Sequence, residues 1–184
     1  MEDLSLHILD VAENCIAAGA SLVEITVEED VAEDRLVITV RDNGRGMDPD
    51  FVSRVLDPFT TTRTTRKVGL GLSLFQQSAQ EAGGDVVVAS SLGMGTTVTA
   101  FMRHSHIDRK PMGDMAETMV TLIEGNPAID FVYTHRRSNR EYVLDTRELR
   151  AYLEELPLNS PGILQLIRDN VKEGIDEVAR DLAV

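Results

Sequence analysis

The sequence predicts an α/β protein in which amphipathic helices alternate with half-buried strands. In some segments apolar residues recur every three or four positions, which is the period of a helix, and in others they alternate with polar residues, which is the period of a strand. The composition, 42% hydrophobic and 27% charged, is that of an ordinary globular chain. A length of 184 residues is enough for one domain with an appendage, or for two small domains.

The first part of the chain contains most of the clearly periodic segments. Its helices end at glycines, at Gly19 and at Gly83-Gly84, and the acidic link EDVAED between the first two strands is typical of an antiparallel hairpin. In order, we expect a helix over 4–18, strands over 22–28 and 35–41, a short helix around 49–56, a helix over 70–82, and strands over 85–90 and 96–102.

The character of the chain changes after Met102. Residues 103–113 have no periodicity, as in a linker, so we expect one domain over 1–103 and a C-terminal extension over 104–184. Asp114 with Glu117, and Asp145 with Glu148, have the spacing that caps a helix. The extension should contain a helix from Asp114 to Glu124, a hairpin of IDFVYTH and EYVLDT around the turn RRSNR, a helix ended by Pro157, and a last helix opened by Ser160-Pro161.

The charge and the cysteine content restrict the partners and the compartment. A formal net charge of −13 argues against nucleic acid and anionic membranes, because their phosphates would be repelled. No apolar run approaches the ~20 residues that span a bilayer, and no signal peptide is visible. The single cysteine, Cys15, allows no internal disulfide. We therefore expect a cytoplasmic protein that binds neither nucleic acid nor membrane.

The stretch PFTTTRTTRKVGLGLSLF, residues 58–75, reverses this charge locally. No acid lies between Asp57 and Glu81, while Arg63, Arg66 and Lys67 cluster among threonine hydroxyl groups. The stretch runs into a predicted helix, whose first N–H groups and dipole favour an anion. The segment therefore indicates an anion site, although each base taken alone is typical of a solvated loop.

Asp10 and Asn14 lie four residues apart and share one face of the first helix. An amide oxygen can bind a hard cation there, and a carboxylate can orient or deprotonate a water molecule. The alternative is a solvated polar face, which we also expect for His7.

Two glycine-containing loops are further candidate ligand-binding segments. In DNGRGM, Asp42 leaves the end of a strand, and Gly44 and Gly46 would let a planar ligand come close. In GMGTT, Thr96 opens the last strand of the first domain. Each loop taken alone is also an ordinary turn.

The order of these motifs carries a resemblance. D-x-x-x-N, D-x-G-x-G, F-T-T-T-R, G-L-G-L and G-x-G-T-T succeed one another in a way that resembles the ATP-binding fold shared by histidine kinases, gyrase-type topoisomerases, mismatch-repair ATPases and large heat-shock chaperones. The resemblance covers residues 4–103. It implies an α+β sandwich, a mixed sheet with helices on one face, and ATP held with Mg²⁺ beneath a mobile lid over residues 58–68.

The resemblance also implies roles for single residues. Asn14 matches the asparagine that binds Mg²⁺, Asp42 matches the aspartate that accepts a hydrogen bond from the adenine amino group, and Thr96 matches a threonine near the adenine. The remaining expected ATP contacts are Gly44 and Gly46, the lid residues Thr62, Arg63 and Lys67, and the phosphate cradle Gly69, Leu70, Gly71 and Leu72.

The chain departs from the family pattern in two respects. Asp10 stands where the ATP-hydrolysing and serine-kinase members usually have glutamate, so we expect Asp10 to be the catalytic base with a side chain one methylene shorter. In addition, no histidine lies in a context like H-E-x-x-x-P, so we expect no autophosphorylation on histidine within this chain. The histidines are His7, His104, His106 and His135.

Three functions are compatible with these observations. The chain is either a Mg-ATP-dependent kinase that acts in trans on an unidentified regulatory protein, as anti-sigma-factor kinases of this fold do, or an ATP-driven switch with slow hydrolysis and no phosphotransfer. A pure interaction module is the third, and the intact Asn14, Asp42 and glycines weigh against it.

The last helix carries an apolar stripe. We expect this stripe to pack on the protein's own body, with a homodimer or a docking surface for the regulated protein as the alternative. Its members are Leu164, Ile167, Val171, Ile175, Val178 and Leu182. The basic cluster HRRSNR, residues 135–140, is expected to be a solvated turn.

Overall fold

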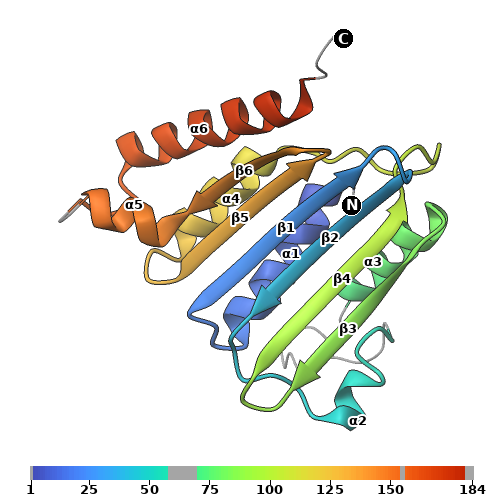
Figure 1. Ribbon diagram of the computed structural model, residues 1–184. Coiled ribbons are helices and arrows are strands. Elements are labelled where there is room, and N and C mark those ends of the chain that lie inside the picture. Colours follow the sequence, from blue (N-terminus) through green and yellow to red (C-terminus); the bar gives the residue numbers. More distant parts are fainter. Residues whose placement is uncertain (1, 58–69, 154–155, 181–184) are drawn as a thin grey trace.

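One sheet organises the molecule, which a computed structural model describes over residues 2–57, 70–153 and 156–180. The described strands pair in the order β3-β4-β2-β1-β5-β6, so the two halves of the chain share the sheet (Figure 1). The strands are β1 (Leu22–Asp30), β2 (Arg35–Asp42), β3 (Asp85–Ser91), β4 (Gly95–Arg103), β5 (Asp130–Arg137) and β6 (Arg140–Asp145).

The sheet is mixed, as expected. β1 and β5 pair in parallel, and the other neighbouring strands pair antiparallel. The parallel pair joins the expected extension to the expected first domain, with Ile25 opposite Tyr133 and Val27 opposite His135. The division of the chain at residue 103 into two folding units stays a prediction.

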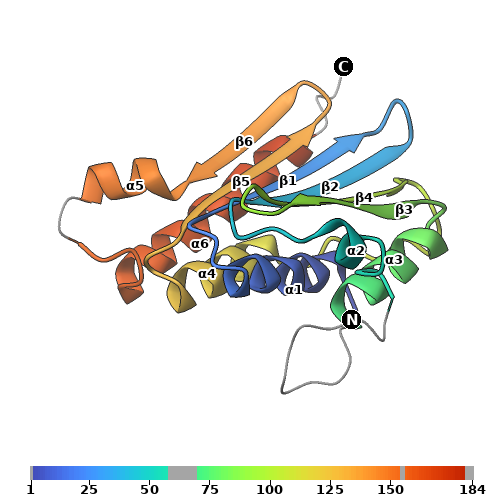
Figure 2. The same ribbon diagram turned by 90° about the horizontal axis from the view of Figure 1, so that it is seen from below.

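The main helices cover one face of this sheet, which confirms the expected α/β architecture. Figure 2 shows α1 (Leu4–Ala17), α3 (Leu70–Glu81) and α4 (Met115–Gly125) below the strands. α6 (Pro161–Ala179) packs against α4, β5 and β6, and the short helices are α2 (Pro49–Val52) and α5 (Thr146–Leu153).

Alternation along the strands builds the core. In β1 the side chains of Val23, Ile25 and Val27 are fully buried, and in β2 Leu36 and Ile38 are fully buried. The intervening residues point to the other face. On the helix side these residues meet the apolar stripes of α1, α3 and α4, which the regular helical spacing brings to one face.

Capping residues explain where the helices begin. Asp3 accepts a hydrogen bond from the N–H of Leu6 at the start of α1. Asp114 accepts one from the N–H of Glu117 at the start of α4, at 2.9 Å. The Glu117 carboxylate lies 2.8 Å from the Arg168 guanidinium, so this side chain ties α4 to α6.

Two sequence expectations were wrong in detail. The helix expected over 49–56 ends at Val52, because the following N–H groups bond three residues back, from Val55 to Val52 and from Asp57 to Arg54, as in turns. The cluster HRRSNR is not a solvated turn throughout: β5 continues to Arg137, and only Ser138 and Asn139 form the turn.

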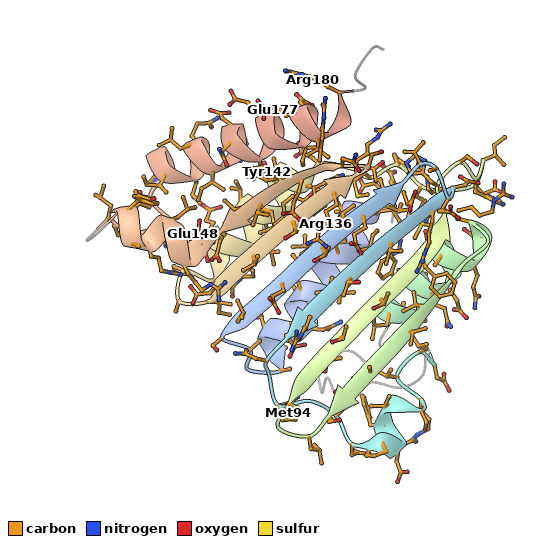
Figure 3. The ribbon with its side chains drawn as sticks, in the orientation of Figure 1. Met94, Arg136, Tyr142, Glu148, Glu177 and Arg180 are labelled. Atoms are coloured by element: carbon orange, nitrogen blue, oxygen red, sulfur yellow. The ribbon has the colours of Figure 1, made fainter. Side chains whose placement is uncertain are left out.

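The stripe of α6 packs on the protein's own body over its described length. Leu164, Ile167 and Val171 are buried, as is Val178, and Leu182 lies outside the described residues. The backbone at Gly174 comes so close to β6 that a Cβ atom there would lie 2.0 Å from the ring of Tyr142, which is labelled in Figure 3.

A polar cluster joins β1, β5 and the linker on the helix side of the sheet. The two oxygens of Glu29 bond to His104 Nε2 at 2.8 Å and to His135 Nε2 at 2.7 Å, and His135 Nδ1 bonds to the Tyr133 hydroxyl at 2.8 Å. Burial by itself raises the pKa of Glu29, but the hydrogen bonds from His135 and His104 outweigh it and lower that pKa to about 2. The carboxylate is therefore ionised and holds the linker to the sheet.

Along the described residues, no helix combines the length and the apolar character that crossing a bilayer requires.

Candidate functional site

The first component of the site is the polar face of α1. Asp10 is half-buried and Asn14 is exposed one turn further along, as their spacing predicts. Asp10 faces α3, because a Cβ atom built on Gly71 would lie 3.1 Å from Asp10 Oδ2. A side chain at position 71 would crowd this carboxylate by a few tenths of an ångström, which glycine avoids.

The second component is the N-terminus of α3. The helix begins at Leu70, whose side chain is 48% exposed, and Leu72 packs against the core. The N–H groups of the first turn of a helix have no acceptor within the helix, and together with the dipole they favour an anion. The predicted phosphate cradle therefore coincides, over Leu70, Gly71 and Leu72, with a helix N-terminus beside Asp10.

The third component is Asp42, at the end of β2. Its side chain is 5% exposed and accepts a hydrogen bond from the Gly44 N–H at 2.7 Å. Burial raises the pKa of the Cys15 thiol, and the adjacent Asp42 carboxylate raises it further by its charge and by a hydrogen bond. The buried Asp42 carboxylate is thus held by the backbone N–H of Gly44 and by the neutral thiol of Cys15.

The loop after Asp42 is fixed on both sides. Asn43 Oδ1 accepts hydrogen bonds from the N–H groups of Ser21 and Leu22, at 2.9 Å and 3.0 Å. The Arg45 N–H donates to the Ala18 carbonyl at 3.0 Å, and the Arg45 carbonyl accepts from the Gly93 N–H at 2.7 Å. These bonds place the loop between the end of α1 and the β3–β4 turn.

The glycines of this loop have a packing role of their own. Gly46 has a φ of +66°, and a Cβ atom there would lie 1.9 Å from the Ser91 carbonyl oxygen. A Cβ atom on Gly44 would lie 2.8 Å from Asp42 Oδ1. The chain itself therefore requires both glycines, while their role in admitting a nucleotide stays a prediction.

Thr96 belongs to the same loop system through Ser90. Ser90 Oγ accepts a hydrogen bond from the Met47 N–H at 2.8 Å, lies 2.9 Å from Thr96 Oγ1, and donates to the Gly95 carbonyl at 2.9 Å. Thr96 is half-buried and lies beside the loop that carries Asp42.

Not every predicted residue lies in the described part of the chain. Asp10, Asn14, Asp42, Gly44, Gly46, Leu70, Gly71, Leu72 and Thr96 are described, whereas Thr62, Arg63, Lys67 and Gly69 lie outside the described residues, as does the predicted lid over 58–68.

His7 does not lie on a solvated face, contrary to expectation. Its ring is fully buried and stacks on Phe75 at a centroid distance of 5.0 Å. The face of α1 that carries His7 is covered by α3, so only Asp10 and Asn14, further along the helix, remain at the polar end.

The residues of the site also fit a magnesium ion brought by a ligand. Within the described residues, no group of three or more histidine, cysteine, aspartate or glutamate side chains is arranged to hold a metal ion. Mg²⁺ commonly takes one or two protein oxygens together with water and phosphate oxygens. Asn14 and Asp10 supply such oxygens beside the N-terminus of α3.

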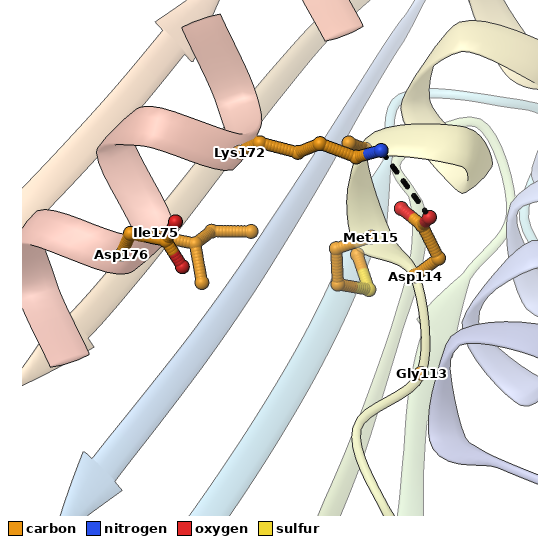
Figure 4. A pocket seen from close by; sticks show the side chains of 7 residues that line it. Gly113, Asp114, Met115, Lys172, Ile175 and Asp176 are labelled. Carbon is orange, nitrogen blue, oxygen red and sulfur yellow. Dashed lines mark ion pairs between the residues drawn. The ribbon is translucent and has the colours of Figure 1, made fainter. Parts of the chain in front are cut away.

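A separate pocket lies between α4 and α6 (Figure 4). Its volume is about 250 Å³, and none of the predicted site residues lines it. Lys172 Nζ lies 3.9 Å from Asp114 Oδ2, and Asp176 lines the pocket on the side away from this ion pair. Two carboxylates against one ammonium make this pocket unsuited to a triphosphate.

Sequence reasoning missed Ser90 and Cys15. No motif marks Ser90, because its role arises from the pairing of β3 with β4 opposite Thr96. Cys15 is buried, and its contact with Asp42 depends on how α1 packs against β2.

Known proteins resemble part of this chain in sequence. The sensor histidine kinase ZraS of Salmonella typhi is 34% identical over 100 residues, which are 54% of this chain and 21% of that protein. The sensor protein SrrB of Staphylococcus aureus is 33% identical over 102 residues, which are 53% of this chain and 17% of that protein. The chain thus spans about a fifth of the length of these curated relatives.

A solved structure extends the likeness of the fold. The N-terminal domain of a DNA repair protein superposes with a TM-score of 0.53 at 17% identity, over 94% of this chain and 56% of that one. At this identity the superposition shows a shared fold.

The family assignment follows from the match along the sequence. The sequence model described as histidine kinase-, DNA gyrase B-, and HSP90-like ATPase matches residues 2–106, which is more than half of the chain. The matched range contains Asp10, Asn14 and Asp42, together with α3 and the loop that ends at Thr96. The chain therefore belongs to the family of histidine kinase-, DNA gyrase B-, and HSP90-like ATPases.

Proposed function

We propose that this chain is a cytoplasmic Mg-ATP-binding regulatory protein that phosphorylates a protein partner in trans. The observation that carries the proposal is the contact between Asp10 on α1 and Gly71 at the N-terminus of α3. It combines a carboxylate, which can accept a proton, with a helix N-terminus, which favours an anion.

Each described residue of the site has a task in this proposal. Asp42, oriented by the Gly44 N–H, accepts a hydrogen bond from the adenine amino group. The first-turn N–H groups of α3 receive phosphate oxygens, and the Asn14 amide oxygen binds Mg²⁺. Bound Mg-ATP would supply the phosphoryl group, and its Mg²⁺ would neutralise the negative charge that develops on that group. Asp10 accepts the proton that the hydroxyl group of the partner loses.

The alternative is an ATP-driven switch with slow hydrolysis and no phosphotransfer. One observation favours it: Asp10 Oδ2 lies 3.1 Å from the position that a Cβ atom on Gly71 would take, so the carboxylate also has a packing role between α1 and α3. A change at the N-terminus of α3 would then pass through Asp10 to α1 without any proton transfer.

A measurement of phosphotransfer distinguishes the kinase from the ATP-driven switch. The chain, an Asp10→Asn variant and a Glu13→Gln control would be incubated with Mg²⁺, γ-labelled ATP and a protein extract. ATP affinity and released phosphate would be measured in parallel. Glu13 is an exposed acid on the same helix, so its change tests for a nonspecific effect of charge.

The kinase proposal predicts that label passes from ATP to another polypeptide. The rate should fall about 100-fold or more in Asp10→Asn, because a general base contributes that much, while ATP affinity stays within about twofold. Glu13→Gln should match the wild type. Binding with slow phosphate release and no labelled partner would support the switch, and absence of ATP binding would overturn both functions.

A further inference from the structure

The sheet has an open face opposite the helices. Figure 1 looks directly onto this face, and no helix of the described chain lies over it there. One row of uncharged side chains runs across all six described strands, because each member is paired with the next in the strand registers. From one edge of the sheet to the other, this Thr/Val row consists of Val87, Thr99, Thr39, Thr26, Thr134 and Val143.

Apolar groups are exposed at and beside this row. Val87 is 55% exposed and Val143 is 49% exposed, at its two ends. Phe101, which is paired with Val37 two residues along from the Thr/Val row, is 36% exposed. The Thr/Val row is therefore apolar at its two exposed ends and weakly polar at its centre, where the threonine methyl and hydroxyl groups lie.

The charges that flank the Thr/Val row neutralise one another. Arg136, labelled in Figure 3, pairs with Glu28 at 3.0 Å and with Glu141. On the other side of the row, Arg41 lies 3.9 Å from Glu24. Arg147 reaches Asp145 at 2.6 Å from the start of α5. These four carboxylates and three guanidinium groups sum to a net charge of −1, whereas the whole chain carries −13.

We infer that a second copy of this chain packs on the open face, so that two sheets lie back to back. Two copies with a charge of −13 each repel one another, and the repulsion is weakest where the two surfaces that meet are nearly neutral. Paired sheets are also a standard packing, with the sheets about 10 Å apart. A basic partner would instead be drawn to the acidic surfaces elsewhere on the molecule.

The size of the face suits a stable dimer. Neighbouring strands lie about 4.8 Å apart and rise about 3.3 Å per residue. The face of this six-stranded sheet therefore measures roughly 29 Å by 25 Å, which is roughly 700 Å² per copy. Specific interfaces bury about 800 Å² per partner. In such a dimer α1 and α3 point outward, so the proposed nucleotide sites of both copies remain accessible.

Sedimentation velocity of the full chain tests this inference. Thr39, at the centre of the Thr/Val row, would be changed to Arg, and Thr121, exposed on α4, would receive the same change as a control. Circular dichroism and the heat of Mg-ATP binding would show that each variant is folded. Because these readouts are independent of the oligomeric state, failure of the dimer and failure of nucleotide binding are distinguishable.

The wild type and Thr121→Arg should sediment as dimers at micromolar concentration. In Thr39→Arg the dimer dissociation constant should rise about 100-fold or more, because like charges would face each other across the interface. Added salt should tighten the wild-type dimer, since it screens the repulsion between two acidic chains. A wild type that stays monomeric, a Thr39→Arg dimer of normal affinity, or a dimer that weakens with salt would overturn the inference.

Discussion

His7 lies fully buried on α1, and within the described residues neither of its ring nitrogens has a hydrogen-bond partner. Desolvation by burial lowers the pKa of His7 to about 4 from an ordinary value near 6.5. In the unfolded chain the same ring takes up a proton near pH 6.5. The neutral histidine therefore contributes its full share of stability above pH 6.5 and loses it as the pH falls from 6.5 to 4.

Replacing His7 by Phe should remove this pH dependence. Phenylalanine keeps the stack on Phe75 and carries no titrating group, so the difference in free energy of unfolding between the variant and the wild type should grow as the pH falls from 7 to 4. The growth should reach up to about 3 kcal/mol, at 1.36 kcal/mol per pH unit. Urea unfolding at half-unit steps of pH measures it.

His106 provides the control for this experiment. It lies in the linker, partly exposed, 3.8 Å from Asp108. A His106→Phe variant makes the same exchange of side chains at a partly exposed position, and it shows how much of the effect the exchange itself produces. A His7→Phe difference that stays constant over this range would show that His7 is not neutral in the folded protein.

At the residue scale, the sequence predicted positions better than environments. The spacing of Asp10 and Asn14 placed them on one helix face, and the strand pattern placed Asp42 at a strand end, because these are local properties of the backbone. The burial of His7 and the contact of Cys15 with Asp42 depend on which element packs on α1. Local spacing carries no information about that.

At the scale of one element, the packing of α6 on β6 depends on the absence of a side chain at Gly174. Gly174 lies in mid-helix, where glycine costs about 1 kcal/mol relative to alanine, yet the ring of Tyr142 occupies the space that a Cβ atom would need. The Tyr142 hydroxyl also donates a hydrogen bond to Asn170 Oδ1 at 2.7 Å, which fixes the ring against the helix.

A Gly174→Ala variant should therefore lower the free energy of unfolding by about 1–3 kcal/mol, the usual cost of overpacking. Gly162, near the start of the same helix, is the control, because a methyl group added there would meet no atom within 4 Å. Gly162→Ala should be neutral or stabilising, by up to about 1 kcal/mol. Urea unfolding of both variants compares them directly, and equal effects at the two positions would contradict the close packing of α6 on β6.

The elements that the sequence predicted well are those with long, regular periodicity, such as α1, α3 and the strands β1 to β4. The expected helix over 49–56 failed because capping by Asp48 starts a helix that three-residue turns soon replace. The end of β5 was misplaced because the polar residues His135 to Arg137 resemble a turn in composition. Their partners, Glu29 and Glu28, come from a strand far away in the sequence.

At the scale of the whole molecule, the sheet order was the least predictable feature from the residues alone. The hairpins follow from short links, but the parallel pairing of β1 with β5 joins segments about a hundred residues apart, and no local pattern specifies it. This pairing unites the two expected parts in one sheet and creates the open face. The site itself needed no such information, since its predicted components lie within residues 10–96.

The central claim is that the polar end of α1, the N-terminus of α3 and Asp42 together bind ATP. Isothermal titration of the chain with Mg-ATP, beside Asp42→Asn and the exposed control Asp108→Asn, tests it most directly. The wild type and the control should bind alike, and Asp42→Asn should bind about tenfold more weakly or worse, since a hydrogen bond to a charged group is worth about 1.5–3 kcal/mol. No binding by the wild type, or an unchanged dissociation constant in Asp42→Asn, would contradict the claim.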